Sequence, residues 1–429
     1  MYVTGIIAEY NPLHSGHQYH IDQTRSIIGD GDAHFIITIL SGNFVQRGLP
    51  AIIDKHTRAR MALEAGSDLV LELPVPYALS SGEGFGFGGV SLLHQLGCVD
   101  ALSFGTEEGT LHKLLPIARV LHFEQTTASK DTPTLYHQAY QTSLKQGLSH
   151  PAAQNKALSC AYPDLDLTVL NGQSNNMLAL EYCKALYRLP SPIRPITVKR
   201  MGQNYLDNAV SECKNSLNFA SATAIREHLK QQPVSGLDSA CDILDGQVNS
   251  FVKDTLLNAH KENRLIQPDD FSHLLQYKLL TLSKEQLTEH LEISNDFANK
   301  ILKNLGQFET FSQFANLLWT KETTYARVCR NLMNLILDIK NDTWDIHQPV
   351  PYARVLGFRK ASASLLSEIK NKSCIPLITK LADAEKLLSP EAFRLLELDM
   401  KAAHIYDSVV LQKTGQKLSR EMQKQIVII

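Results

Sequence analysis

The first third of the chain alternates short apolar runs with longer amphipathic stretches. The apolar runs are rich in β-branched residues and have the length of buried strands. They lie at 3–8, 34–40, 68–73 and 101–104. Helical spacing follows the first three runs, with Asp54 placed to cap the second helix, at about 17–28, 54–65 and 81–96. Strands that alternate with helices in this way predict parallel βαβ units with right-handed crossovers.

The rest of the chain is more helical. A strand pattern returns at 193–199, and a capped helix is predicted from Ser221 to about residue 230. Residues 231–236 have the composition of a linker, and helical spacing dominates beyond them. We therefore predict an α/β, parallel-sheet domain with a helical insertion, followed by a mainly α-helical domain, at 1–232 (insertion 107–170) and 237–429.

The composition narrows the class of protein. With 44% hydrophobic and 20% charged residues, the chain resembles ordinary globular proteins. A net charge of −2 argues against a generally basic nucleic-acid coat protein, although a local basic face suffices to bind a folded RNA. The 7 cysteines form no C-x-x-C pair, which favours free thiols in a reducing compartment. Neither a secretory leader pattern nor a long apolar run occurs, so a cytoplasmic protein that does not enter a membrane is expected.

The strongest chemical signal is the turn after the first strand, where residues 11–17 read N-P-L-H-S-G-H. A helix N-terminus presents unpaired N–H groups and a partial positive charge, which suit a polyphosphate. Gly16 has no side chain, so a phosphate can approach the backbone closely. His14 and His17 are placed to donate hydrogen bonds to one phosphate oxygen, where charge builds during attack on an α-phosphate.

Two other interpretations of this turn were weighed. His14 and His17 alone are compatible with plain turn and capping roles, but their place between a first strand and a helix favours phosphate binding. With His20 they also suggest a metal site, yet no cysteine or carboxylate pattern lies nearby, so zinc is not favoured. His20 is better interpreted as a helix-surface or supporting residue.

A second element at Ser221–Arg226 has the pattern S-x-T-x-I-R at a helix start. Alone it predicts an ordinary capped helix. Together with the H-x-G-H turn it resembles the nucleotidyltransferase superfamily of Rossmann-like adenylyltransferases, in which hydroxyls, helix N–H groups and an arginine hold the β- and γ-phosphates.

The resemblance extends to one family of that superfamily, the tRNA(Met) cytidine acetate ligases. It rests on long motifs across most of the chain, at 5–17, 41–48, 68–74, 103–105, 174–182, 195–200 and 351–358. Residues 107–170 match least well. The resemblance implies a Rossmann-like nucleotidyltransferase domain and a ligase that activates acetate with ATP as acetyl-adenylate. The acetyl group then passes to N4 of the wobble cytidine of elongator tRNA(Met), giving N4-acetylcytidine.

The resemblance also implies functional residues. His14 and His17 would be catalytic, and Mg²⁺ is expected with ATP, although no ligand for it can be named. The implied ATP site comprises Ile7, Ala8, Glu9, Tyr10, Asn11, Pro12, Leu13, His14, Ser15, Gly16, His17, Gln18, Tyr19, His20, Gly105, Asn175, Asn176, Arg200, Ser221 and Thr223. Gly105, the two asparagines and Arg200 have simpler alternatives as turn, capping and surface residues.

Two further expectations concern the other substrates. Arg47 or Lys55, near the end of the second strand, is expected to contact the acetyl-adenylate or the target base. For the tRNA, we expect contacts from the basic and aromatic segment at 351–374, chiefly from Arg354, Arg359 and Lys360. A solvated helix face is the alternative interpretation of that segment.

Two other functions remain open from the sequence alone. The first is an adenylyltransferase that acts on a small phosphorylated metabolite, for which the large helical second half is unnecessary. The second is an RNA-binding protein whose nucleotide pocket is regulatory, which the intact His14, Gly16 and His17 disfavour.

Overall fold

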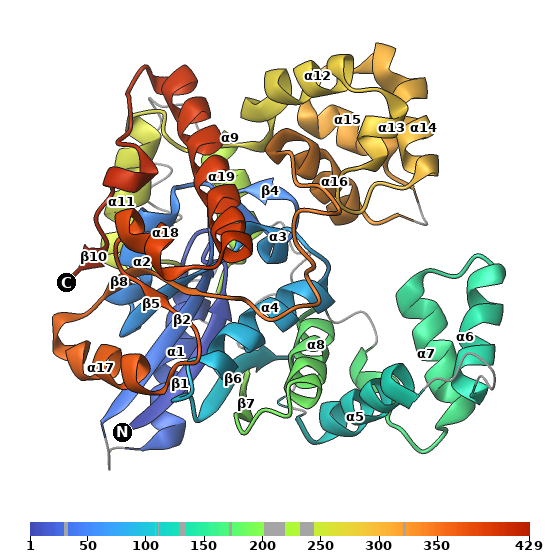
Figure 1. Cartoon of the computed structure of the whole chain (residues 1–429), viewed down its shortest axis with the longest axis horizontal. Helices are drawn as coiled ribbons and strands as arrows, with labels where there is room; N and C mark the ends of the chain where they lie inside the picture. The colour runs from blue at the N-terminus through green and yellow to red at the C-terminus, as the bar shows by residue number, and fades with distance from the viewer. Residues whose placement is uncertain are drawn as a thin grey trace.

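The computed structural model describes residues 1–29, 33–107, 109, 111–127, 134–170, 174–200, 219–231, 244–320 and 323–429. A mixed β-sheet runs through its centre (Figure 1). The sheet strands are β1 (Tyr2–Ala8), β2 (His34–Ser41), β5 (Leu69–Leu73), β6 (Ala101–Thr106), β7 (Arg194–Lys199), β8 (Ala353–Phe358), β9 (Leu377–Ile378) and β10 (Val427–Ile428). A separate two-stranded ribbon pairs β3 (Phe44–Val45) with β4 (Leu49–Pro50).

The strands follow the order β10-β8-β5-β2-β1-β6-β7, with β9 paired to β8. The five strands predicted from the N-terminal half, β5, β2, β1, β6 and β7, are mutually parallel. The order reverses beside β1, because β2 and β5 lie on one side of it and β6 and β7 on the other. Open parallel sheets bind ligands at such a switch point, beyond the carboxyl ends of the strands.

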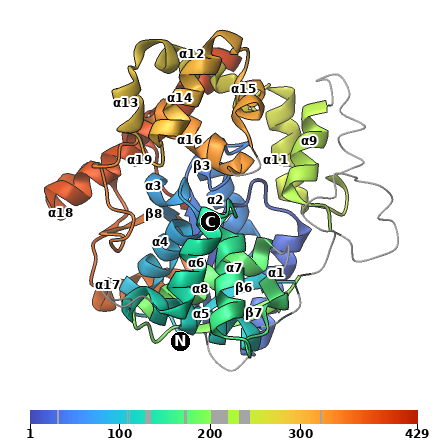
Figure 2. The same cartoon turned by 90° about the vertical axis from the view of Figure 1, so that its right-hand side faces the viewer.

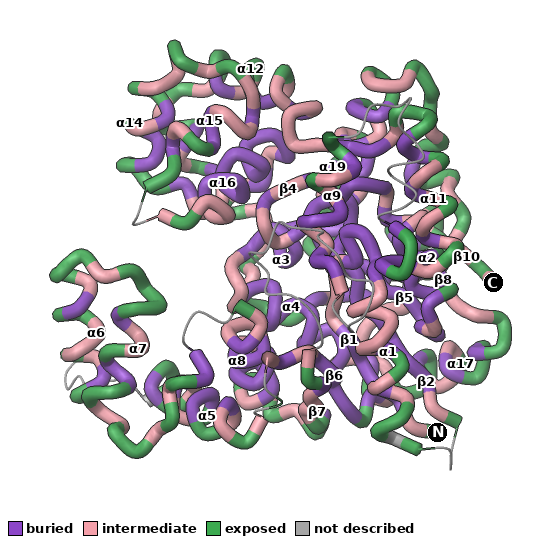
Figure 3. Tube along the Cα trace, turned by 180° about the vertical axis from the view of Figure 1, so that it is seen from behind, coloured by how far each residue is buried: buried purple, intermediate pink, exposed green. Residues whose placement is uncertain are grey.

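Each face of the sheet is covered by helices, and the inner strands are mostly buried, whereas the edge strands β7 and β10 are partly exposed (Figure 3). On β2, Ile36 and Leu40 pack into one apolar cluster, while Ile37 and Ile39 pack into another on the opposite face. This alternation follows from the two-residue period of a strand. Helices α1 and α2 lie on the first face, and α4 and α8 on the second.

The predicted helices of the first half are confirmed with small shifts at their ends. Helix α1 begins at Ser15, two residues before the predicted start, because His14 serves as its N-cap. Asp54 caps α2 and Ser81 caps α4, as their sequences indicate. These helices and those of the insertion are α1 (Ser15–Ile28), α2 (Lys55–Glu64), α3 (Val75–Ala78), α4 (Gly82–Gln95), α5 (Leu111–Thr127), α6 (Leu135–Lys145), α7 (His150–Ala161), α8 (Ser174–Arg188) and α9 (Ala222–Gln231).

The second half is mainly helical, as predicted, but it also extends the sheet. Its α-helices are α11 (Ser250–Lys261), α12 (Ser272–Thr281), α13 (Lys284–Thr288), α14 (Asn295–Asn304), α15 (Phe311–Leu318), α16 (Tyr325–Leu337), α17 (Ala363–Lys372), α18 (Ala384–Leu387) and α19 (Pro390–Thr414). Strand β8 pairs antiparallel with β5, so this half is joined to the sheet as well as to its own helices. The boundary expected at 232–237 lies outside the described residues.

Two groups of helices stand away from the sheet. Helices α12–α16 share an apolar core with α19 and with Phe44, Val75 and Leu79 of the first half. In Figure 2 they lie above the sheet, while α6 and α7 form a hairpin that projects on the near side. None of the helices in the described part of the chain is long and apolar enough to cross a membrane.

Candidate functional site

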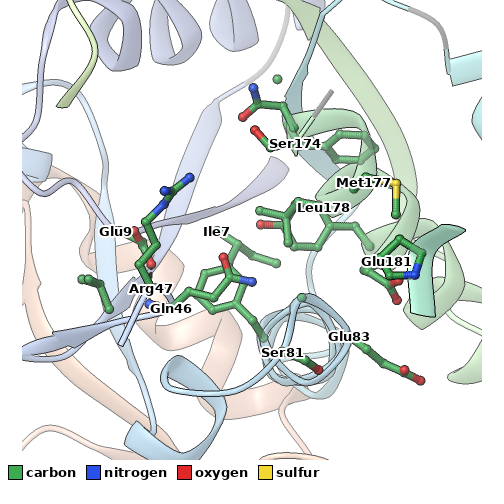
Figure 4. Close-up of a pocket in the computed structure, with 18 of the residues that line it drawn as sticks. Ile7, Glu9, Gln46, Arg47, Ser81, Glu83, Ser174, Met177, Leu178 and Glu181 are labelled. Atoms are coloured by element: carbon green, nitrogen blue, oxygen red, sulfur yellow. Dashed lines mark hydrogen bonds between the residues drawn. The ribbon is translucent and has the colours of Figure 1, made fainter. Parts of the chain in front are cut away.

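A cavity of about 1400 Å³ opens at the carboxyl ends of β1, β6 and β7. It exceeds the roughly 300–1000 Å³ of ordinary small-molecule pockets, so it has room for more than one ligand. Its floor is the sheet edge, and its walls come from α4, α8, the α6–α7 hairpin and the start of α16. Figure 4 shows Glu9 and Arg47 on one side of this cavity and Glu181 on the other.

The H-x-G-H turn forms one end of this cavity. His14 is the N-cap of α1, and its Nδ1 accepts a hydrogen bond from the Gly16 N–H at 3.1 Å. A Cβ atom at Gly16 would lie 2.9 Å from His14 Cε1, so a larger residue would displace the ring. The glycine therefore allows the imidazole to lie against the helix start, where the partial positive charge of the helix is concentrated.

The two histidine rings of this motif are held in one tautomer. They stack with their centroids 3.8 Å apart, and His17 Nδ1 accepts a hydrogen bond from the His14 N–H at 3.3 Å. Both Nδ1 atoms are therefore acceptors, which leaves the proton of each neutral ring on Nε2. The turn thus offers two Nε2–H donors from adjacent rings to a ligand in the cavity.

The rings are neutral because charging them is unfavourable here. Burial and the charges of Arg200 and Arg226 lower the pKa of His14 to about 3. Burial lowers the pKa of His17 well below its usual value, and that of His20 to about 4 with help from Arg200. Neutral imidazoles with a fixed Nε2–H can donate hydrogen bonds to a phosphate, but they are poor proton acceptors.

The depressed pKa of His14 predicts a pH dependence of stability. Because the folded-state pKa lies below the unfolded one, protonation favours the unfolded chain, and stability is lost as the pH falls from the unfolded pKa toward the folded pKa of about 3. Asparagine is a good N-cap that does not titrate. His14→Asn should therefore flatten the fall in unfolding free energy below about pH 6.5, by on the order of 1 kcal/mol per pH unit. Urea unfolding at several pH values measures this, and parallel curves for the two proteins would contradict it.

Arg200 and Arg226 bring positive charge to the same end of the cavity. Arg200 follows β7, its N–H donates to the Thr106 carbonyl at 2.9 Å, and its side chain crosses Gly105. A Cβ at Gly105 would lie 3.2 Å from Arg200 Cγ, so glycine at this position lets the arginine reach over the strand. Arg226 Nη1 donates to the Asn11 carbonyl at 2.5 Å and thereby ties α9 to the H-x-G-H turn.

Most residues of the implied ATP site line the cavity. Those that do are Ile7, Ala8, Glu9, Tyr10, Asn11, His14, Gly16, His17, Tyr19, His20, Gly105, Asn175, Arg200 and Ser221. The others support the turn from outside. Pro12 and Leu13 are buried behind it, and Gln18 Nε2 donates to the Ala65 carbonyl. Ser15 Oγ donates to the Gly246 carbonyl, and Thr223 Oγ1 accepts from Arg226.

Asn176 was expected in the ATP site, but the structure favours its alternative role as a structural residue at the start of α8. Asn176 is fully buried, its Oδ1 accepts from the Glu107 N–H at 3.0 Å and its Nδ2 donates to the Val169 carbonyl at 2.9 Å. Asn176 does not line the cavity, and these bonds anchor the start of α8 to the end of β6. Its neighbour Asn175 lines the cavity and donates to the Glu107 carboxylate at 2.5 Å.

Lys55 and Arg354 were expected at ligand surfaces, but both are buried in one ion-pair network. Lys55 Nζ lies 2.7 Å from Glu72 and 2.9 Å from Glu421, and the lysine is 1% exposed. Arg354 is 3% exposed and bridges the same two carboxylates at 2.6 and 2.5 Å. Neither side chain can reach a base or an adenylate. Of the pair proposed for that contact, Arg47 does line the cavity.

The other two expected tRNA contacts, Arg359 and Lys360, lie at the end of the sheet opposite to the cavity. Phe358 pairs with Leu69, the first residue of β5, so the residues that follow it are at the amino ends of the parallel strands. Arg359 donates through its guanidinium to the carbonyls of Leu63 and Ser67. Lys360 is exposed there. These two cations therefore face away from the cavity.

Several cavity residues were not predicted. They come from the start of α4, from α8, from the helical hairpin and from α16, and they include Ser81, Glu83, Glu181, Lys184, Tyr140, His150, Arg327 and Arg330. Ser81 carried a usable signal, because it caps the helix that follows the third predicted strand and so faces the carboxyl edge. The hairpin and α16 reach the site only through long-range packing.

Among the residues that the structure describes, no cluster of three or more His, Cys, Asp or Glu side chains could hold a metal ion.

The sequence matches known proteins along almost its whole length. The family described as HIGH Nucleotidyl Transferase matches residues 1–422. A tRNA(Met) cytidine acetate ligase of Clostridium novyi (strain NT) is 37% identical over 413 residues, covering 95% of this chain and 96% of that protein. A protein of the same name from Acetivibrio thermocellus is 33% identical, with 100% of both chains covered.

The fold also matches solved structures. Thermotoga maritima TmcAL bound with alpha-thio ATP is 26% identical in sequence and superposes with a TM-score of 0.87 over 100% of both chains. Its apo form superposes with a TM-score of 0.88. The agreement therefore includes the helical half as well as the sheet.

Proposed function

Because this chain belongs to the tRNA(Met) cytidine acetate ligase family of HIGH nucleotidyl transferases, we propose that it activates acetate with ATP and acetylates the wobble cytidine of elongator tRNA(Met) at N4. The products of the first step are acetyl-adenylate and pyrophosphate, and those of the second are N4-acetylcytidine and AMP. Since its substrate is a tRNA, we place the protein in the cytoplasm. The observation that carries the proposal is the pair of stacked histidines whose Nε2–H groups face a cavity large enough for both substrates.

In the first step an acetate oxygen attacks the α-phosphorus of ATP, and the bond to the pyrophosphate oxygen breaks. Negative charge accumulates on the non-bridging α-phosphate oxygens as the attack proceeds. His14 and His17 are positioned to donate hydrogen bonds to this charge, and no reorganisation is needed because the backbone already holds both rings.

The remaining phosphates are assigned to the arginines and the two helix starts. Arg200 lies close enough to lower the pKa values of His14, His17 and His20, so its charge acts at this end of the cavity. Ser221 caps α9, where its Oγ accepts from the Ala224 N–H at 3.1 Å and the helix N-terminus faces the cavity. Mg²⁺ would accompany the ATP, held mainly by phosphate oxygens and water and neutralising their charge.

The competing function is an adenylyltransferase that joins AMP to a small phosphorylated metabolite. ATP–pyrophosphate exchange distinguishes it from an acetate ligase, because exchange by each enzyme depends on its own acceptor. We expect exchange with acetate and none with phosphorylated metabolites. Exchange with a phosphorylated metabolite and not with acetate would overturn the proposal.

We place the tRNA at the mouth of the cavity, between the α6–α7 hairpin and α16. Arg327 lines the cavity on α16 and is partly exposed, whereas the neighbouring Arg330 and Lys184 are buried and paired with Glu292 and Glu181. On the hairpin, Tyr140 and His150 line the same space, and their side chains are joined at 2.8 Å. Cations that meet phosphates and aromatic rings that stack on unpaired bases are the usual means of binding a single-stranded loop.

Charge reversal distinguishes this placement from the expected contacts at Arg359 and Lys360. Arg327→Glu should weaken binding of tRNA(Met) by about 10-fold or more at low salt, because one phosphate contact is lost and replaced by repulsion. The effect should shrink as the salt concentration rises. Lys360→Glu, at the opposite edge, serves as the matched variant. Filter binding of the transcript measures both, and a larger loss in Lys360→Glu would show that the tRNA binds at the edge of the sheet that carries Lys360.

A further inference from the structure

The second half of the proposed reaction needs a proton acceptor. The cytidine N4 amine attacks the carbonyl carbon of acetyl-adenylate, the bond from that carbon to the phosphate oxygen breaks, and AMP leaves with the electron pair. The new amide nitrogen must lose one proton. The paired histidines are unsuited to accept it, because each Nδ1 already accepts a backbone N–H and each Nε2 carries its proton.

Four carboxylates line the cavity. Two of them form ion pairs with neighbouring cations, and a third is partly exposed to solvent. Glu181 lies 2.8 Å from Lys184, and Glu292 lies 3.3 Å from Arg330. Glu83 stands at the first turn of α4, where its side chain is 42% exposed. The fourth is Glu9, which directly follows β1 and precedes the H-x-G-H turn.

The environment of Glu9 directs its carboxylate into the cavity. Oε1 accepts a hydrogen bond from the Gln46 N–H at 2.7 Å, which fixes the orientation of the group. The side chain is only partly buried, and its exposed part borders the cavity beside Arg47 (Figure 4). Its position at the end of β1 places it on the same sheet edge as the histidines that face the α-phosphate.

We propose that Glu9 is a catalytic residue of the transfer step, in which its carboxylate accepts the proton that leaves the cytidine N4 amine. This inference rests on the proposed function. Burial raises the pKa of Glu9, while the Gln46 N–H and the charges of Arg47, Arg226 and Arg58 lower it, with burial the larger effect. A raised pKa makes the ionised carboxylate a stronger base than an exposed glutamate.

Glu9→Gln tests this inference, because glutamine keeps an oxygen that can accept the Gln46 N–H and removes the basic carboxylate. The full-length protein is loaded with labelled acetate and ATP, and adenylate is measured as acetohydroxamate after addition of hydroxylamine. A tRNA(Met) transcript is then added and the single-turnover rate of label transfer is measured. We expect transfer to fall by about 100-fold or more relative to adenylate formation, as for loss of a general base. Glu9→Asp, which keeps a carboxylate, should recover part of the rate.

Glu397→Gln is the matched control, since it makes the same substitution at an exposed position of α19 that does not line the cavity and should retain transfer. An equal loss of adenylate and transfer in Glu9→Gln would show that Glu9 acts on the nucleotide or on the fold, and would overturn the inference. A normal transfer rate would overturn it as well. If the wild-type protein formed no adenylate from acetate, the proposed function itself would fail, which is a separate result.

Discussion

Replacing His17 with alanine should lower the rate of acetyl-adenylate formation by about 100-fold to 1000-fold, as expected when one preorganised donor to a developing oxyanion is removed. The reason is geometric. His17 has its Nδ1 bound to the His14 N–H and its ring stacked on His14, so its Nε2–H is fixed before the substrates bind. ATP–pyrophosphate exchange in the presence of acetate measures the loss.

The control for this variant is His404→Ala, which removes an exposed histidine from α19 and should leave exchange unchanged. Urea unfolding of both proteins separates a chemical effect from a loss of folded enzyme. If His17→Ala were folded and exchanged pyrophosphate at the normal rate, the assignment of the oxyanion donors would be wrong.

The second large effect concerns stability. Arg354→Met should reduce the free energy of unfolding by about 3–5 kcal/mol, because it leaves Glu72 and Glu421 buried with one cation fewer. Lys55, the other cation that both carboxylates contact, is itself 1% exposed, so water cannot replace the guanidinium. Urea or thermal unfolding measures the change, and the matched variant Lys360→Met should change it by less than about 0.5 kcal/mol because Lys360 is on the surface.

The same variant also tests the tRNA assignment. Arg354→Met should lower tRNA acetylation only in proportion to the fraction of protein that is unfolded, since the arginine has no access to a ligand. A stable Arg354→Met protein with a specific loss of tRNA binding would contradict the buried network.

The sequence was informative where the signal is local. Strands β1, β2, β5 and β6 are short apolar runs with turn residues at their ends, and the cap at Asp54 is read directly from the residue type. The H-x-G-H turn was found for the same reason, because its strand, glycine and helix are consecutive. Helix α1 started earlier than predicted only because a histidine is an uncommon N-cap.

Long-range packing accounts for what the sequence did not reveal. Strand β8 pairs with β5 across almost 300 positions, and no local feature of 353–358 indicates that partner. Arg354 looked like a surface cation because its partners Glu72 and Glu421 are far away in the sequence. The contribution of the α6–α7 hairpin to the cavity likewise follows from how the insertion folds back, which no periodicity predicts.

The measurement that tests the central claim most directly combines the purified protein with ATP, Mg²⁺, labelled acetate and an unmodified elongator tRNA(Met) transcript. Digestion of the tRNA to nucleosides should recover the label as N4-acetylcytidine, and a transcript with uridine at the wobble position should remain unlabelled. Acetyl-adenylate should accumulate when tRNA is left out, and both products should form at least about 100-fold more slowly with His17→Ala. Absence of both adenylate and labelled tRNA with the wild-type protein would contradict the assignment of this cavity as an acetate ligase site.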